Sequence, residues 1–525
     1  MNGIKNSRGH LDTRAFNVVN IILNNVLKSL KMKILTKRIF AFLLIIVMLG
    51  ACTEDFEEVN NDPNRPKEIT PGVVLEQLQY RMLTASLTRA RSFTHNLMQV
   101  DAPRSSTNGG GVHRYIITPG EPLWETFYLL FNDLEDIISI AEDLEEDNYK
   151  AIALVYKAWA YSILTDLYGD IPYSEATKAI DGNFSPSFDT QKDIYIDLLN
   201  NLELANSLFD ESKALTFQGD LLYDANQASG GRNEGIVKWK KFGNSLRLRL
   251  LLRISKRDGE VPVSEQINAI LSSPTNYPVF ESNADEAILR FPGTFPYFNP
   301  YFNARTLEWR DGTYFTHYFL DSLNAVEDPR REVWVRPIEE NGELIYRGIE
   351  SGYLVTTEYN VGANSSYRDE LKTDPKLGIM MTYAELEFIK AELAIKGFAT
   401  GGTAKAHYDA GITASMVQWE ADMPNDFLQR DGVAFNESAS EDAQLEQIIQ
   451  QKYYAYVFVD YQAWFEKRRT GYPVLPRGTG ILPESNFPSR VPYPTYLQSL
   501  NPKGLQEAVS RIGGDNSDIK VWWDK

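Results

Sequence analysis

Apolar residues recur at the spacing of an α-helix along most of this chain, and this period limits its possible folds more than any other feature. It is clearest at 127–144, where acids occupy the opposite face of an apolar stripe: Phe127, Leu130, Phe131, Leu134, Ile137, Ile138, Ala141 and Leu144. The next segment, 149–168, is apolar on nearly all sides, so we expect a helix packed on several faces. Together the two segments predict an all-α core.

Further helices are expected at 72–100, 190–210, 236–256, 263–272, 382–397, 403–420 and 441–469. Antiparallel pairs of such helices are the unit of tetratricopeptide-like stacks, although no clean repeat consensus accompanies them here. We therefore predict a single helical domain over residues 72–525. Its two helical halves are separated by an irregular, aromatic-rich segment at about 275–375.

Two parts of this chain lack the helical period. Residues 291–317 are rich in aromatic residues, Pro and Gly, which predicts an irregular segment. Residues 331–361 predict short strands, with a turn at Asn341-Gly342. The tail from about 471 is rich in Pro and Gly and is expected to wrap the body.

The single cysteine, Cys52, ends the only strongly hydrophobic stretch. Basic residues after Met32 precede an apolar run, Ile39–Ala51, whose 13 residues are too few to span a bilayer. This arrangement resembles the bacterial lipobox, which implies cleavage before Cys52 and lipidation of its thiol. A buried core helix that ends in an ordinary cysteine is the alternative.

Acids follow Cys52 almost at once and resemble the surface-export signal of Bacteroidetes lipoproteins: Glu54, Asp55, Glu57 and Glu58. We predict that residues 1–51 are an upstream extension plus signal peptide and that 52–71 form a lipidated, flexible tether. Within the extension, 1–31 are interpreted as the product of a misplaced start codon. A genuine amphipathic segment is the alternative.

The charge of the expected mature chain excludes some partners. The whole chain has a formal net charge of -18, but residues 1–51 contain eight Lys or Arg and one acid. The remaining 474 residues carry 45 basic and 70 acidic side chains, a net charge of -25. Such a surface repels nucleic acid and anionic lipid, and it suits a neutral or cationic ligand.

The sequence gives little support to an enzyme. The four histidines after the signal are far apart, without an HExxH pattern, and the chain has no GxSxG, GxGxxG or P-loop motif. A glycoside hydrolase stays open as a remote alternative, because its paired carboxylates need not be local in sequence. A purely structural or adhesive surface protein is a third class. No cofactor or metal site is predicted, although calcium bound by scattered oxygens leaves no motif.

Five segments stand out along the chain: YSILTDLYGDIPYSEAT (161–177), VKWKKFGNSLRLRLLLRIS (237–255), MMTYAELEFIKAELAIKG (380–397), the segment 445–475 with its Arg-Arg-Thr-Gly-Tyr-Pro motif, and RVPYPTYLQSLNP (490–502). In this order they resemble the SusD/RagB family of nutrient-binding outer-membrane lipoproteins, in particular its starch-binding-associated branch. The tether NNDPNRP also fits. The resemblance covers almost all of residues 52–525.

This resemblance implies an all-α fold of tetratricopeptide-like helix pairs and an outer-membrane position facing the cell exterior. It also implies a partner, a SusC-like TonB-dependent transporter, to which the lipoprotein delivers captured oligosaccharide. Peptide is the alternative ligand, because some members of the family carry it.

Several matched residues are interpreted as architectural: Asp170, Pro172, Arg247, Arg249, Glu385, Glu392, Trp464, Arg468 and Arg469. Asp170 and Pro172 can cap or end a helix. Glu385 and Glu392 lie on one helix face, and we expect them to form buried ion pairs between helices with Arg247, Arg249, Arg468 or Arg469.

A sugar-binding site needs aromatic faces and a few polar anchors, because pyranose rings stack on Trp and Tyr. Two segments supply both, 291–317 and the loop 104–115. The candidate ligand contacts are Tyr297, Tyr301, Asn303, Trp309, Arg310, Tyr314, His113 and Tyr115. The alternative is that about half of the aromatic residues attach the loop to the body.

Overall fold

The computed structural model describes residues 22–23, 25–33, 69–106, 110–120, 122–226 and 231–525. They fall into two units, Met1–Ile69 and a compact unit, Thr70–Lys525. In the first unit, residues 22–23 and 25–33 are helical. Cys52 and nearly all of the predicted tether lie outside the described residues. No helix among the described residues combines the length and the apolar character that a membrane crossing requires.

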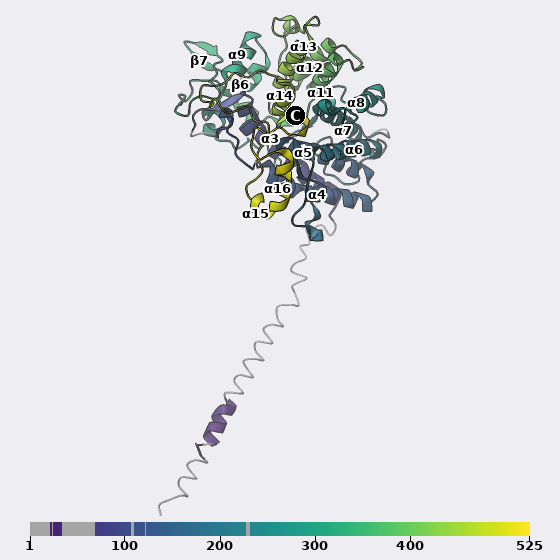
Figure 1. Cartoon of the computed structure of the whole chain (residues 1–525), viewed down its shortest axis with the longest axis vertical. Coiled ribbons are helices and arrows are strands. Elements are labelled where there is room, and N and C mark those ends of the chain that lie inside the picture. The colour runs from purple at the N-terminus through teal and green to yellow at the C-terminus, as the bar shows by residue number, and fades with distance from the viewer. Residues whose placement is uncertain (1–21, 24, 34–68, 107–109, 121, 227–230) are drawn as a thin grey trace, which may run out of the picture. The chain divides into compact units, whose positions relative to one another are not determined.

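Helices dominate the compact unit, in two groups (Figure 1). The first group contains α3 (Pro71–Arg89), α4 (Leu123–Asp143), α5 (Asp147–Tyr168), α6 (Gln191–Leu208), α7 (Glu234–Arg253) and α8 (Val263–Ser272). The second contains α11 (Tyr383–Ile395), α12 (Ala404–Gln418), α13 (Glu441–Ala455) and α14 (Gln462–Thr470). Consecutive helices pack against each other, which confirms the all-α, tetratricopeptide-like prediction.

Polar caps fix where many of these helices begin. Thr190, Thr382, Thr403 and Ser440 each accept a hydrogen bond from a backbone N–H in the first turn of α6, α11, α12 and α13. Asn233 does the same for α7. Each cap satisfies a donor that the helix itself cannot pair, so the starts are encoded locally.

Helix α5 is the centre of the core, as its apolar sequence predicts. Trp159 and Ile163 are fully buried, and the Phe131 ring of α4 stacks on Tyr161 at 3.8 Å between centroids. Because α5 packs against α4, α6 and α7, it needs apolar residues on every face.

One buried ion pair joins the two helical groups, and another connects two helices of the second group. The Arg249 guanidinium on α7 donates to both carboxylate oxygens of Glu385 on α11, from Nε at 2.6 Å and from Nη2 at 2.5 Å. Arg469 on α14 makes the same two-point contact with Glu392, at 2.6 Å from each Nη. Arg247 instead bonds Glu203 and Gln266. These side chains tie α7, α11 and α14 together.

The remaining motif residues hold the tail against the body. Arg468 pairs with Asp524 at 3.4 Å, and the Trp464 indole donates to the Pro488 carbonyl at 2.8 Å. Asp170 accepts from the Gln191 backbone N–H, the first of α6, at 3.0 Å and from Arg511 at 2.7 Å. Pro172 pairs with Phe188 where β2 (Ile171–Pro172) meets β3 (Phe188–Asp189).

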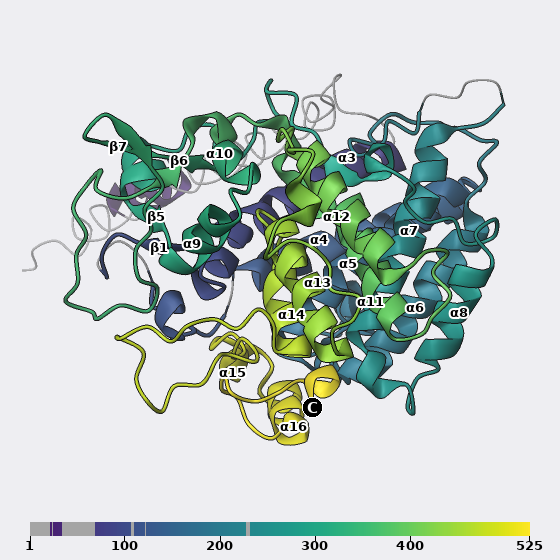
Figure 2. The same ribbon diagram turned by 90° about the horizontal axis from the view of Figure 1, so that it is seen from above.

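Short strands and helices fill the region between the helical groups. They are β4 (Ala287–Leu289), β5 (Thr313–Phe315), α9 (His317–Ala325), α10 (Arg330–Trp334), β6 (Val335–Arg336), β7 (Ile338–Glu340), β8 (Glu343–Ile345), β9 (Ser366–Tyr367) and β10 (Gly378–Met381). Figure 2 shows most of them gathered beside the stacked helices. The Asn341-Gly342 turn is confirmed: both residues have positive φ and join β7 to β8.

Two of the expected helices are wrong in part. The helix predicted over 441–469 is two helices, because the chain turns at Phe458, where φ is +64°. The first helix is regular only to Arg89 and continues as a wider π-helical segment, Ala90–His95. The tail contains α15 (Leu497–Leu500) and α16 (Pro502–Ile512), and the Asn501 side chain caps the second of these.

Candidate functional site

The two segments that the sequence singled out lie side by side. β1 (Asp101–Pro103) pairs antiparallel with β5, so that Pro103 stands opposite Thr313. The Arg104 N–H continues the pairing by donating to the Gly312 carbonyl at 2.8 Å. The loop after β1 and the turn before β5 are therefore held together at one edge of the irregular region.

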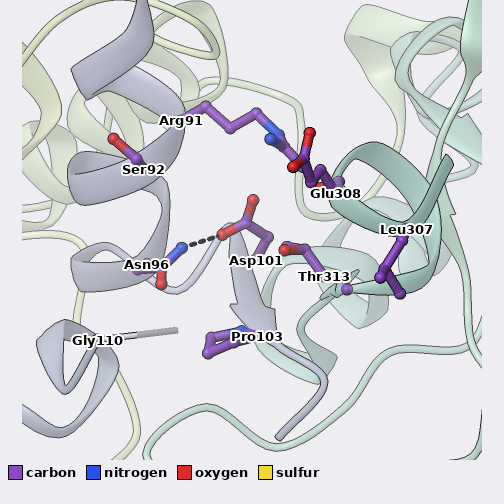
Figure 3. A pocket seen from close by; sticks show the side chains of 10 residues that line it. Arg91, Ser92, Asn96, Asp101, Pro103, Gly110, Leu307, Glu308 and Thr313 are labelled. Carbon is purple, nitrogen blue, oxygen red and sulfur yellow. Dashed lines mark hydrogen bonds between the residues drawn. The ribbon is translucent and has the colours of Figure 1, made fainter. Parts of the chain in front are cut away.

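A cavity of about 410 Å³ lies between these segments (Figure 3). Its lining includes Arg91, Ser92 and Asn96 from the end of the first helix, Asp101 from β1, and Glu308 and Thr313 from the facing segment. Figure 3 shows the Asp101 and Asn96 side chains directed toward each other on one side, with Arg91 reaching across to Glu308. Leu307 and Pro103 add apolar surface, so the lining is mixed, and we name the site the Asp101 cavity.

Arg91 fixes one wall of the Asp101 cavity. Its Nη2 donates to the carbonyls of Glu308 at 2.9 Å and of Trp309 at 3.1 Å. Its guanidinium carbon lies 4.6 Å from the Trp309 ring centroid and 5.0 Å from that of Tyr367. A cation over two aromatic faces that also bonds two backbone carbonyls holds the π-helical segment Leu307–Asp311 in place.

A hydrogen-bonded chain supports the floor of the cavity. The Tyr367 hydroxyl donates to the Asp101 carboxylate at 2.6 Å and lies 2.7 Å from His95 Nδ1. The Phe458 N–H donates to His95 Nε2 at 3.0 Å, so the ring proton belongs on Nδ1. The floor is thus anchored to the turn between α13 and α14.

Burial sets the charges of His95 and Asp101 in this hydrogen-bonded network. It lowers the pKa of His95 to about 3, helped by the positive charge of Arg91, and the ring is neutral. Burial also raises the pKa of the Asp101 carboxyl to about 6, and Arg91, Tyr367 and Asn96 oppose that rise. The floor therefore carries one negative charge at neutral pH.

Four of the candidate ligand contacts are buried. Trp309 donates its indole N–H to the Arg368 carbonyl at 3.0 Å, and Tyr301 donates to the Leu87 carbonyl at 2.8 Å. The Tyr314 hydroxyl bonds the backbone of residues 360 and 362, and His113 Nδ1 accepts from the Gly352 N–H. In this structure these side chains attach their segments to the body.

The other four candidates are at least partly exposed. Tyr297 bonds Glu76 on α3, and Arg310 lies 3.3 Å from Asp311 and 3.5 Å from Asp369. Tyr115 packs edge-on against Phe487, and Asn303 is exposed. None of the eight is in the cavity lining, although Trp309 and Tyr301 lie directly behind Arg91.

Sequence reasoning missed the polar residues that do line the cavity, above all Arg91, Asn96, Asp101 and Glu308. The available signal was the break at Asp101-Ala-Pro103, which marked a helix end but not a buried carboxylate. Among the described residues, no group of three or more His, Cys, Asp or Glu is placed to hold a metal ion. The site offers hydrogen bonds and charge.

Comparisons with known proteins agree with this architecture. A SusD-like family model described as starch-binding associating with outer membrane matches residues 63–494. A chitin-binding protein is 27% identical, with a TM-score of 0.71, and a SusD homolog from Bacteroides uniformis is 26% identical, with a TM-score of 0.72. Each similarity covers 87% of this chain and 100% of the other.

A chitin-binding SusD homolog from Flavobacterium johnsoniae shares the fold, with a TM-score of 0.71. It is 21% identical, over 86% of this chain and 97% of its own. No curated protein matches the sequence.

Proposed function

Because the chain belongs to the SusD-like family of proteins described as starch-binding and associating with the outer membrane, we propose that it captures glycan at the cell surface. It delivers this glycan to a SusC-like TonB-dependent outer-membrane transporter. A lipid on Cys52 holds it in the outer membrane, facing the cell exterior. It binds its ligand without turnover.

The observation that carries this proposal is the Asp101 cavity. Its volume of about 410 Å³ falls within the range of small-molecule sites, roughly 300–1,000 Å³. Two strands and the Arg91 contacts fix its walls on a rigid helical body. The polar side chains in its lining suit the hydroxyl groups of a sugar, and the acidic surface of the chain disfavours anionic partners.

Peptide is the second candidate ligand, for the same kind of transporter. A peptide would occupy the same cavity as a glycan, but it offers backbone amide groups to the lining where a glycan offers hydroxyl groups. Separate calorimetric titrations distinguish the two ligands. An oligosaccharide and a peptide mixture are each titrated into the purified protein, and we expect heat of binding from the oligosaccharide alone.

A hydrolase, the remote alternative, is tested in the same samples. We expect an oligosaccharide incubated with the protein to be recovered intact by chromatography. Shortened products would replace the capture proposal with a glycosidase. Failure to bind any glycan, while a transporter still co-purifies, would favour a structural subunit.

Membrane attachment is predicted to depend on Cys52. We expect the Cys52→Ala protein to appear in the soluble fraction after cell lysis, because it lacks the thiol that accepts the lipid. The measurement is fractionation followed by immunoblotting, with the unchanged chain as the membrane-bound control. A Cys52→Ala protein that stays with the outer membrane contradicts lipid anchoring at this residue.

A further inference from the structure

The Asp101 cavity offers several hydrogen-bond acceptors. The Asp101 carboxylate only accepts, and it takes the Asn96 Nδ2 donor at 2.5 Å. The other end of that amide, its Oδ1 acceptor, is therefore left for a ligand. The Ser92 hydroxyl donates to the Thr88 carbonyl at 2.7 Å, so its oxygen lone pairs are left to accept a hydrogen bond from a ligand. Figure 3 shows these side chains around one space.

The positive charge in the lining is held against the wall. Arg91 donates from Nη2 to two backbone carbonyls, and its guanidinium lies over the rings of Trp309, Tyr367 and Tyr301. These contacts hold the Arg91 guanidinium against carbonyls and aromatic rings of the protein.

Two carboxylates, Asp101 and Glu308, lie beside this cation, and Arg305 pairs with the second of them. Among the described residues, the one ion-pair contact of Asp101 is His95 Nδ1 at 4.0 Å, and that ring is neutral. Asp101 itself is shielded from solvent, so its charge acts on the cavity from beneath. At the rim, the Glu308 side chain is about half exposed, and its partner Arg305 is more exposed still.

We infer that the Asp101 cavity selects a sugar unit that carries a free ammonium group, as in an oligosaccharide of glucosamine, over neutral and acidic sugars. This inference rests on the proposed function and names its substrate class. An ammonium group brings three donors and no acceptor, which matches the acceptors of Asn96, Ser92 and Glu308. A uronic acid brings acceptors in place of these donors, and its carboxylate lies beside the carboxylates of Asp101 and Glu308.

The test compares tetrasaccharides that differ in one substituent. The full-length protein is titrated by calorimetry with β-1,4-linked glucosamine tetramer, cellotetraose and the glucuronic acid tetramer, at a pH where the amine is charged. Maltotetraose and tetralysine are titrated in parallel. We expect the glucosamine tetramer to bind about tenfold more tightly than cellotetraose, as one charge-assisted hydrogen bond provides, and the acid to bind most weakly.

A rim variant locates the effect. Glu308→Gln keeps the shape of the side chain but removes its charge, and we expect the ratio of the glucosamine-tetramer affinity to the cellotetraose affinity to shrink about tenfold. Glu142→Gln is the matched control, since Glu142 is similarly exposed and pairs with Lys150 on the helical body. We expect it to change neither affinity.

The outcomes separate this inference from the proposed function. Binding of a neutral tetrasaccharide without tighter binding of the amino sugar overturns the inference and leaves glycan capture standing. Tighter binding of tetralysine than of any sugar overturns it in favour of a cationic peptide. If no tetrasaccharide binds, both the inference and the proposed function fail.

Discussion

Glu385→Ala is expected to lower the free energy of unfolding by about 3–5 kcal/mol, because it leaves a buried arginine without its partner. Arg249 and Glu385 are both buried, and the guanidinium contacts both carboxylate oxygens. The Tyr456 hydroxyl also donates to Glu385, at 3.0 Å. The substitution therefore removes an ion pair and one further hydrogen bond from the junction of α7, α11 and α13.

Urea denaturation followed by circular dichroism measures this change. Glu507→Ala is the control, because Glu507 pairs with Lys503 on the exposed face of α16 and such pairs contribute about 0–1 kcal/mol. Equal effects of the two substitutions would contradict the view that the Arg249–Glu385 pair ties the two helical groups together.

Trp309→Ala is expected to cost about 3–5 kcal/mol of stability, as large buried aromatic side chains do, and to abolish glycan binding. Trp309 is fully buried, with the Tyr301 ring at 4.9 Å and the Tyr367 ring at 5.3 Å between centroids. It also carries the Arg91 guanidinium on its face. Its loss leaves a void behind Arg91, so the wall of the Asp101 cavity moves.

Trp522→Ala is the matched control for Trp309. Trp522 is only partly buried, near the end of the chain, and its indole donates to Glu260 at 3.2 Å. We expect a smaller loss of stability, about 1 kcal/mol, and unchanged glycan affinity. Denaturation gives the first quantity and calorimetric titration the second. Trp309→Ala protein that is folded and binds glycan normally would show that this wall is not part of the site.

The helical part of the fold was predictable because each element is encoded locally. The segment 127–144 has a complete apolar stripe, and Thr190, Thr382 and Thr403 cap the helices that follow them. The turn at Asn341-Gly342 is equally local. The break at Phe458 was not predictable, because it depends on the bond from its N–H to His95, 363 residues away in sequence.

The cavity was predictable in position but not in composition. Residues 104–115 and 291–317 were identified by their irregular, aromatic sequence, and the pairing of β1 with β5 brings their ends together. Long-range contacts decide which side chains then face inward. The Trp309 ring packs against the Arg91 guanidinium, behind the wall of the cavity. Asp101 and Asn96, which belong to no sequence motif, lie at its floor.

Purification of the tagged, lipidated chain from native outer membrane, with mass spectrometry of the proteins that accompany it, tests the central claim most directly. Capture of glycan for import requires the channel to be present in the same complex. We predict recovery of a SusC-like TonB-dependent transporter in amounts comparable to the tagged chain. A folded, lipidated protein that is recovered without any such transporter would contradict the proposed role in import.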